Sequence, residues 1–268
     1  MSGKAGARGL RVHRIDVHLG GVRVLHGVTF EVHPGEVFGI VGPNGAGKTT
    51  ILNVIDGVVR PTAGTVHYGG LNLGRVQPHA MRKHGIGRSL QSTHYFHGLT
   101  ALELVALAEL PNSVPGAVRF AGHRSRSPRA RSAGRGSRER AADALQQFGL
   151  SQYAQRPLSE LSTAVQKLLD IARAVVAGTD LLLLDEPTSG VSGQERGAIG
   201  EAVLKLRQLG RTIVLIDHDP GFVTMNCDRL MAMNSGQVLC TGTPSEVMAS
   251  EVVKRSYLGE AADDAGEG

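Results

Sequence analysis

The chain lacks the features that mark membrane-spanning and secreted proteins. Among its 268 residues, no apolar run reaches the roughly 18 residues that cross a bilayer. The first residues, MSGKAGARGLR, lack the apolar centre of a secretory signal, so we expect none. Cys227 and Cys240 are the only two cysteines, and their spacing fits no metal site, which favours small, reduced, buried thiols. A chain of this length can bury a large core, in one large domain or two modest ones.

A general excess of basic charge is also missing. The formal net charge is +5, but the stretch from Arg119 to Arg140 holds eight Arg and one Glu, a local +7 that leaves −2 for the rest. A uniformly basic nucleic-acid-binding protein is therefore not supported. The part from Arg119 to Gly136 is rich in Arg, Ser and Gly, so we predict an exposed, mobile insertion there. Binding of this segment to nucleic acid or to anionic lipid headgroups is the alternative.

Residues 42–50 read GPNGAGKTT and match the phosphate-binding pattern G-x-x-x-x-G-K-[ST]. Glycine lets backbone N–H groups approach a polyphosphate closely. Lys48 brings a positive charge to the β and γ phosphates, and the hydroxyl of Thr49 can bind Mg²⁺. We therefore predict a nucleoside triphosphate and Mg²⁺ as cofactors. The predicted nucleotide contacts are Gly42, Pro43, Asn44, Gly45, Ala46, Gly47, Lys48, Thr49 and Thr50.

Two later strands predict the second half of a nucleotide site. The aliphatic run Leu181–Leu184 leads directly into Asp185 and Glu186. Successive side chains of a strand point in opposite directions, so we assign Asp185 to the metal and Glu186 to the general base that activates water. His218 follows the apolar run Thr212–Ile216 and is predicted to hold Glu186 and the γ-phosphate.

The order of elements predicts an α/β fold. The first third reads as short strands, and the last third alternates strand and helix. Such alternation implies a mainly parallel sheet with helices on both faces. Predicted strands are Leu10–Val17, Val22–Leu25, Val28–Val32, Glu36–Val41, Leu181–Leu184, Thr212–Ile216, Arg229–Met233 and Gln237–Thr241. Predicted helices are Thr49–Gly57, a segment capped by Thr100 and Glu103 that runs to Leu110, Arg138–Phe148, Gln194–Leu209, and a short helix after Thr243 with Pro244 first.

In order and spacing these motifs resemble an ATP-binding cassette (ABC) protein. Asp185 lies 137 residues after Lys48, and His218 lies 33 after Asp185, which leaves room for the helical insertion of that family. The resemblance covers roughly residues 10 to 258. The segments HGIGRSLQ, LLDIARAV and YLGE resemble the ATPases of branched-chain amino-acid importers, and those of urea and amide importers are similar.

The resemblance implies a P-loop NTPase fold of ABC type, with an N-terminal antiparallel β subdomain. It implies one domain over 10–258, with a helical subdomain at about 92–165 and flexible tails at 1–9 and 259–268. It also implies an ATPase that binds membrane permease subunits at the cytoplasmic face and powers solute uptake, served by an extracytoplasmic binding protein. Gln91 would contact the metal or the attacking water, and Leu19 would contact adenine in place of an aromatic residue.

The sequence departs from the family at its signature, LSGGQ. Here the segment reads Leu161-Ser162-Thr163-Ala164-Val165, so the second glycine is alanine and the glutamine is valine. In the family this segment contacts the ATP bound by the partner subunit, whereas Lys48, Asp185 and Glu186 serve the chain's own ATP. Ser192 also replaces the usual aspartate or asparagine of the subunit-crossing loop. We therefore predict a second ATP-binding subunit in an asymmetric heterodimer, with a homodimer as the alternative.

Three rival functions remain open at this stage. A non-hydrolysing nucleotide-binding regulator is disfavoured by Glu186 and His218, which matter chiefly for chemistry. An ABC ATPase associated with nucleic acid is disfavoured because only Phe120 in the arginine-rich segment can stack on a base. A GTPase or small-molecule kinase is disfavoured because the chain has no N-K-x-D motif for guanine.

Overall fold

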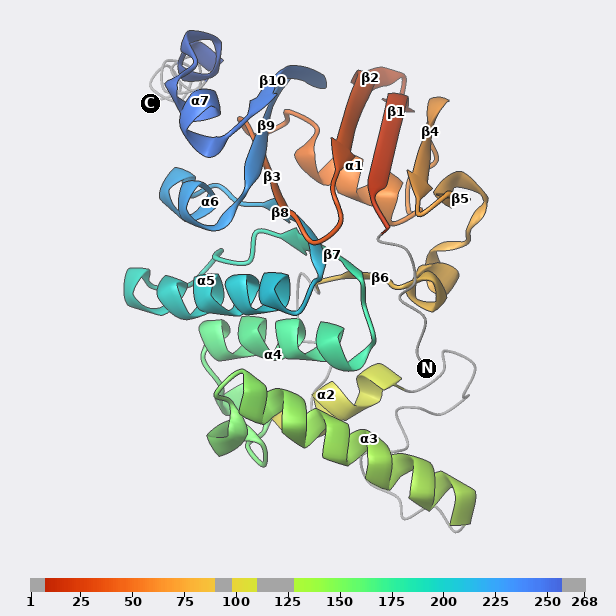
Figure 1. Cartoon of the computed structure of the whole chain (residues 1–268), viewed down its shortest axis with the longest axis vertical. Helices are drawn as coiled ribbons and strands as arrows, with labels where there is room; N and C mark the ends of the chain where they lie inside the picture. Colours follow the sequence, from red (N-terminus) through yellow and green to blue (C-terminus); the bar gives the residue numbers. More distant parts are fainter. Residues whose placement is uncertain (1–7, 90–97, 110–127, 257–268) are drawn as a thin grey trace.

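A computed structural model describes residues 8–89, 98–109 and 128–256 of the chain. Two β-sheets share the upper part of the molecule, and a helical part lies below them (Figure 1). The larger sheet has the strand order β10-β9-β3-β8-β7-β6, and the smaller has the order β2-β1-β4-β5. The predicted fold class, a mainly parallel sheet with an antiparallel β subdomain and a helical subdomain, is confirmed.

The larger sheet is parallel except at its β10 edge. β3 pairs in parallel with β8 and β9, and β7 with β6 and β8, whereas β10 runs antiparallel to β9. The carboxyl ends of the parallel strands therefore meet along one edge, where open α/β sheets bind ligands. The strands are β3 (Val37–Val41), β6 (Ile86–Arg88), β7 (Leu181–Asp185), β8 (Thr212–Ile216), β9 (Arg229–Asn234) and β10 (Gln237–Gly242).

The smaller sheet is antiparallel and corrects the sequence prediction in two ways. The predicted strands Val22–Leu25 and Val28–Val32 form one strand, because shifts in the register between β1 and β2 accommodate the residues between them. β4 and β5 were not predicted, since half of β4 is exposed and lacks a clear apolar alternation. The strands are β1 (Leu10–Leu19), β2 (Val22–Val32), β4 (Ala63–Tyr68) and β5 (Leu71–Asn72).

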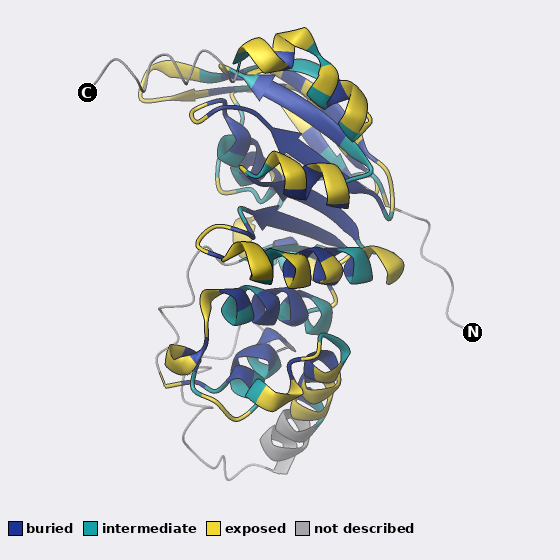
Figure 2. Ribbon diagram, turned by 90° about the vertical axis from the view of Figure 1, so that its left-hand side faces the viewer, coloured by how far each residue is buried: buried dark blue, intermediate teal, exposed yellow. Residues whose placement is uncertain are grey.

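Helices cover both faces of the larger sheet (Figures 1 and 2). The predicted cap of Thr100 with Glu103 is confirmed as a complete capping box. The helix predicted after Thr243 begins with Pro244 as expected, and Thr243 with Glu246 adds a second capping box that was not predicted. The helices are α1 (Lys48–Ile55), α2 (Ala101–Ala106), α3 (Pro128–Gln147), α4 (Thr163–Val176), α5 (Gly193–Gln208), α6 (Pro220–Asn226) and α7 (Pro244–Ala249). Short 3₁₀ turns occupy Leu73–Arg75, Pro78–His84, Leu107–Glu109, Ser151–Tyr153 and Leu158–Glu160.

The start of α3 differs from the prediction. A helix was expected from Arg138, with a mobile insertion before it, but α3 begins at Pro128. Proline suits the first position of a helix, and Arg and Ala are good helix formers, so local propensity outweighs the low apolar content. Residues 119–127 of the predicted insertion lie outside the described residues.

The core consists of two apolar clusters, one on each face of the larger sheet. Along β7, Leu181 and Leu183 belong to the cluster shared with α1 and the smaller sheet, whereas Leu182 and Leu184 belong to the cluster shared with α2 to α7. β8 alternates in the same way. Burial on both faces explains the continuous aliphatic runs of these strands.

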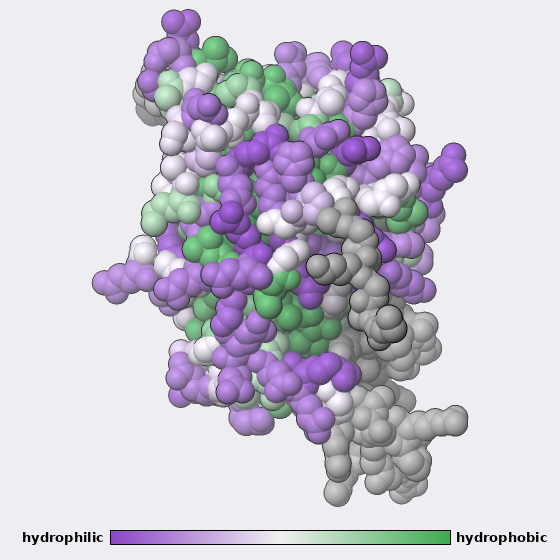
Figure 3. Space-filling view, in the orientation of Figure 1, coloured by the Kyte–Doolittle hydropathy of each residue, from purple (hydrophilic) through white to green (hydrophobic). Residues whose placement is uncertain are grey.

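On the surface shown in Figure 3, hydrophilic side chains predominate, with apolar ones gathered at the level where the helical part meets the sheet. None of the helices in the described parts of the chain is both long and apolar enough to cross a membrane.

Candidate active site

The phosphate loop connects the carboxyl end of β3 to the first turn of α1. Gly47 caps α1 with φ of 94°, a left-handed conformation that a side chain would strain. A Cβ at Gly42 would lie 2.1 Å from the carbonyl oxygen of Met233, so the loop passes β9 too closely for any side chain. Gly42 and Gly47 of the pattern thus both have a steric cause: only glycine permits this path of the backbone.

Lys48 is buried inside the loop. It is 6% exposed, and its Nζ donates to the carbonyl oxygens of Gly42 at 2.6 Å and Pro43 at 2.7 Å. These bonds hold the ammonium group against the backbone of the loop that leads into α1. A buried cation and a helix N-terminus at one place form an anion site.

A pocket of roughly 200 Å³ unites the phosphate loop with the ends of two other strands. Glu186, after β7, and His218, after β8, reach the lining that Lys48 and Thr49 also form. The structure therefore brings together most of the predicted site residues. Val24 of β2 also lines the pocket and was not predicted, because nothing in the sequence sets it apart from other strand residues. The lining residues are Val24, Asn44, Gly45, Ala46, Gly47, Lys48, Thr49, Thr50, Glu186 and His218.

Glu186 and His218 form a direct hydrogen bond. Nε2 of His218 lies 2.7 Å from Oε1 of Glu186, and both side chains remain partly exposed at the pocket. Glu186 has φ of 49°, an unusual value for a non-glycine residue. Its N–H donates to the carbonyl oxygen of Ile216, and its own carbonyl accepts from Lys167 of α4. The strained backbone is thus held from β8 and from α4.

A second link joins the loops that follow β7 and β8. The carboxylate of Asp217 is buried and accepts from both the N–H and the hydroxyl of Thr188, at 3.0 and 2.7 Å. Asp219 caps α6 through the N–H of Phe222, and this bond, with help from Arg196, lowers the pKa of the Asp219 carboxyl. His218 therefore lies between two anchored aspartates, which restricts its position relative to Glu186.

Asp185 is held by an arginine that the sequence did not single out. Oδ2 of Asp185 accepts from Arg88 of β6 at 2.7 Å, and the Asp185 N–H donates to the hydroxyl of Ser89 at 3.2 Å. The other arm of the Arg88 guanidinium donates to Asn53 of α1 at 2.6 Å. Only the tertiary fold shows that β6 carries a partner for the predicted metal ligand.

The residues present suit a magnesium ion. Mg²⁺ prefers hard oxygen ligands such as hydroxyls and carboxylates, usually in company with substrate phosphates. The hydroxyl of Thr49 is in the first turn of α1 at the phosphate pocket, and the buried carboxylate of Asp185 directly precedes Glu186. This donor set is consistent with the predicted metal site.

The altered signature segment begins α4. Ser162 caps this helix by accepting from the Val165 N–H at 3.4 Å, and its hydroxyl donates to Glu195 of α5 at 3.2 Å. Ser192 donates to the other Glu195 oxygen at 2.7 Å. The bonds from Ser192 and Ser162 lower the pKa of the Glu195 carboxyl, against the opposing effect of desolvation. Glu195, which was not predicted, therefore ties Ser162 at the start of α4 to Ser192 at the start of α5.

The side chains of the signature segment face different surroundings. Ala164 is 3% exposed and packs in the apolar core, and Val165 is partly buried. Ser162 and Thr163 are exposed. The methyl group of Ala164 therefore points into the protein rather than toward the surface.

Among the described residues, four of those predicted for the chain's own nucleotide and metal are absent from the pocket lining: Leu19, Gly42, Pro43 and Asp185. Leu19 ends β1 with 46% of its surface exposed and is absent from the lining. Its neighbour His18 is bonded to the hydroxyl of Thr62, at 3.4 Å from Nδ1. Gln91 lies outside the described residues.

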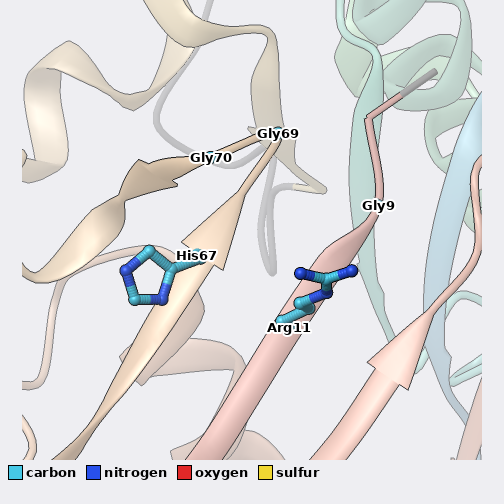
Figure 4. Close-up of a pocket in the computed structure, with 5 residues that line it drawn as sticks. All are labelled: Gly9, Arg11, His67, Gly69 and Gly70. Atoms are coloured by element: carbon cyan, nitrogen blue, oxygen red, sulfur yellow. The ribbon is translucent and has the colours of Figure 1, made fainter. Parts of the chain in front are cut away.

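Another hollow, of about 450 Å³, lies in the smaller sheet beside Gly9, Gly69 and Gly70 (Figure 4). Arg11 and His67 occupy opposite positions on β1 and β4 there, and Arg11 is ion-paired with Glu31 at 3.5 Å. Of the described residues, none that lines it carries a carboxylate, a hydroxyl or a thiol. This hollow therefore lacks the groups that nucleotide hydrolysis needs.

A phosphate loop between a parallel strand and a helix, facing an acidic pair at the carboxyl end of another strand of the same sheet, defines a P-loop nucleotide hydrolase. Within that class, the profile of the ABC transporter family matches residues 25–189, and the chain belongs to this family. It is thus an ATPase whose hydrolysis of ATP is coupled to transport.

Relatives match over nearly the full length. The chain is 34% identical over 253 residues to the high-affinity branched-chain amino acid transport ATP-binding protein LivG of Escherichia coli K12, covering 94% of this chain and 98% of that one. It is 31% identical, with the same coverage, to BraF of Pseudomonas aeruginosa, which bears the same description. The crystal structure of the ADP conformation of MJ1267, an ATP-binding cassette of an ABC transporter, superposes with a TM-score of 0.82 at 28% identity, covering 94% and 99% of the two chains.

Proposed function

We propose that the chain is the ATP-hydrolysing subunit of an importer for branched-chain amino acids or a related small polar solute. The similarity to LivG and BraF over 94% of the chain supports this solute class. Residues 10–258 would act as one ATP-binding domain, including a helical subdomain at about 92–165. The subunit would bind permease subunits at the cytoplasmic face of the membrane, and an extracytoplasmic binding protein would deliver the solute.

The observation that carries hydrolysis is the hydrogen bond between Glu186 and His218 at the mouth of the phosphate pocket. Glu186 accepts a proton from the water that attacks the γ-phosphate, and His218 keeps the carboxylate oriented. Lys48 and the loop N–H groups stabilise the charge that grows on the phosphate oxygens. Thr49 and Asp185 would hold Mg²⁺, which would neutralise charge on the phosphates. ATP and water are thereby converted into ADP and phosphate, which leave the site.

The second part of the proposal is an asymmetric dimer. The residues for the chain's own ATP are intact, whereas the signature that would face the partner's ATP reads Ser162-Thr163-Ala164-Val165. A partner subunit with a complete signature would permit hydrolysis at one of the two composite sites. The partner's ATP would be hydrolysed slowly.

Affinity purification of the tagged chain from its native membrane tests both parts. We expect permease subunits and a second ATP-binding subunit to co-purify, and phosphate release by the complex to exceed that of the isolated chain. Robust hydrolysis by the isolated chain would contradict the asymmetric dimer. Recovery without any permease would contradict the transport role.

A further inference from the structure

The guanidinium of Arg88 joins two halves of the nucleotide site. Arg88 is the last residue of β6, next to β7 in the sheet. One nitrogen donates to Oδ2 of Asp185 at 2.7 Å and the other to Oδ1 of Asn53 at 2.6 Å. Asn53 belongs to α1, the helix that begins with Lys48 and Thr49. A single planar group therefore connects the predicted metal carboxylate to the helix of the phosphate loop.

This ion pair differs from the surface pairs of the protein. The side chains of Arg88 and Asp185 are 15% and 2% exposed, whereas those of Arg207 and Asp228 are 48% and 28% exposed. Salt and water screen a buried pair much less than an exposed one, so the attraction between Arg88 and Asp185 is the stronger. The planar fork of arginine also holds two acceptors in fixed directions, which lysine does not.

The backbone of Arg88 is anchored as well. Its carbonyl oxygen accepts from Arg173 of α4 at 3.3 Å, and Arg173 is itself paired with the buried Asp170 at 2.8 Å. The next residue, Ser89, donates its N–H to Leu183 and accepts from the Asp185 N–H. Contacts from α4 and β7 thus fix the position from which the guanidinium reaches Asp185.

We propose that Arg88 is a positioning residue for the magnesium ligand Asp185, which it orients and ties to α1. The inference rests on the proposed magnesium site. Groups that orient a metal ligand contribute roughly 10- to 100-fold to metal affinity. The contribution of Mg²⁺ to nucleotide affinity therefore depends on Arg88, while the metal-free affinity depends on the loop and Lys48.

The test compares binding of the β,γ-imido analogue of ATP to the full chain with excess Mg²⁺ and with EDTA, by calorimetry. Arg88→Met should lower the ratio of the two affinities roughly tenfold and leave the EDTA value nearly unchanged. Asn53→Ala removes the acceptor of one arm of the guanidinium fork, and Arg88→Lys keeps the positive charge without the fork. Each should lower the ratio of the two affinities by less than Arg88→Met does. Arg207→Met breaks an exposed pair and should leave the ratio unchanged.

Equal loss of both affinities in Arg88→Met, or an unchanged ratio, would overturn the inference and leave Arg88 a purely structural residue. If Arg88→Met does not fold, an unchanged ratio in both Asn53→Ala and Arg88→Lys overturns it. If the unaltered chain binds the analogue equally with and without Mg²⁺, the proposed magnesium site fails instead. The two failures are therefore distinguishable.

Discussion

The conformation of Glu186 opposes its own backbone preference. A non-glycine residue at positive φ costs on the order of 1–3 kcal/mol, and it persists only where its surroundings hold it. Here the Glu186 N–H donates to the carbonyl oxygen of Ile216, and the Glu186 carbonyl oxygen accepts from Lys167. The carboxylate is hydrogen-bonded to His218. The strain is therefore balanced by contacts that also aim the carboxylate at the phosphate pocket.

Glu186→Gln should separate chemistry from binding. Glutamine has the same shape and still accepts a hydrogen bond from His218, but it cannot take up a proton from water at neutral pH. We expect phosphate release to fall at least about 100-fold, the lower end of the general-base effect. The affinity for ATP, measured by calorimetry, should stay within the range of the unaltered chain.

His218→Ala provides the matched comparison. It removes the group that orients Glu186 but leaves the base itself, so we expect a smaller loss of turnover. Turnover unaffected by Glu186→Gln would show that Glu186 is not the base and would contradict hydrolysis at this pocket.

Individual residues were predictable where a pattern fixes their chemistry. Lys48, Thr49, Glu186 and His218 were named from the sequence, and the structure places all four on one pocket. Arg88, Val24 and Glu195 were not named. Their roles depend on which strand or helix lies next to them, and a single arginine or valine in a strand carries no sign of its neighbour.

At the scale of elements, strands that are buried on both faces were predicted from the sequence, whereas a partly exposed strand was not. The runs of β3, β7 and β8 are buried on both faces and were predicted as continuous apolar strands. β4, with three exposed residues at its start, gave no such signal. The helix α3 begins in an arginine-rich stretch because helix propensity, rather than apolar periodicity, determines its first turns.

Tyr68 on β4 should make the stability of the smaller sheet sensitive to alkali. Burial, followed by the nearby charge of Asp180, raises the pKa of Tyr68 from 10.0 to about 12. Below pH 10 the phenol is neutral in both the folded and the unfolded chain, so its ionisation does not reduce the free energy of unfolding. As the pH rises from about 10 to 12, the unfolded chain ionises first, so stability falls by up to about 3 kcal/mol at about 1.4 kcal/mol per pKa unit.

Tyr68→Phe removes this ionisation and isolates it from the titration of lysines and other tyrosines. Urea denaturation across this range should show the variant gaining stability relative to the unaltered chain as the pH increases. A difference that stays constant from pH 8 to pH 12 would contradict the assignment.

At the scale of the whole molecule, the chain presents two unequal surfaces. One is the phosphate pocket, where Lys48, Glu186 and His218 lie at or just beyond the ends of β3, β7 and β8. The other is the start of α4, where Ser162 is exposed and bonded to Glu195 while Ala164 packs inward. The asymmetry of the proposed dimer would come from the second surface alone.

Restoring the family signature tests that asymmetry without knowledge of the partner. In the isolated chain, any dimer contains two altered signatures, so both composite sites should be slow. The double variant Ala164→Gly with Val165→Gln returns a glutamine that can hydrogen-bond and a glycine at the helix start. A hydrogen bond to a charged group is worth about 1.5–3 kcal/mol, so phosphate release should rise roughly tenfold or more.

The gain must come from hydrolysis at the described site and not from a contaminant or from a change in folding. Adding Glu186→Gln to the double variant should abolish the increase. Ala164→Gly removes a buried methyl group from a helix and should lower stability by about 1 kcal/mol, which urea denaturation would measure separately. If turnover stays at the level of the unaltered chain while the protein remains folded, the altered signature has no kinetic consequence, and a symmetric dimer of this chain becomes the better description.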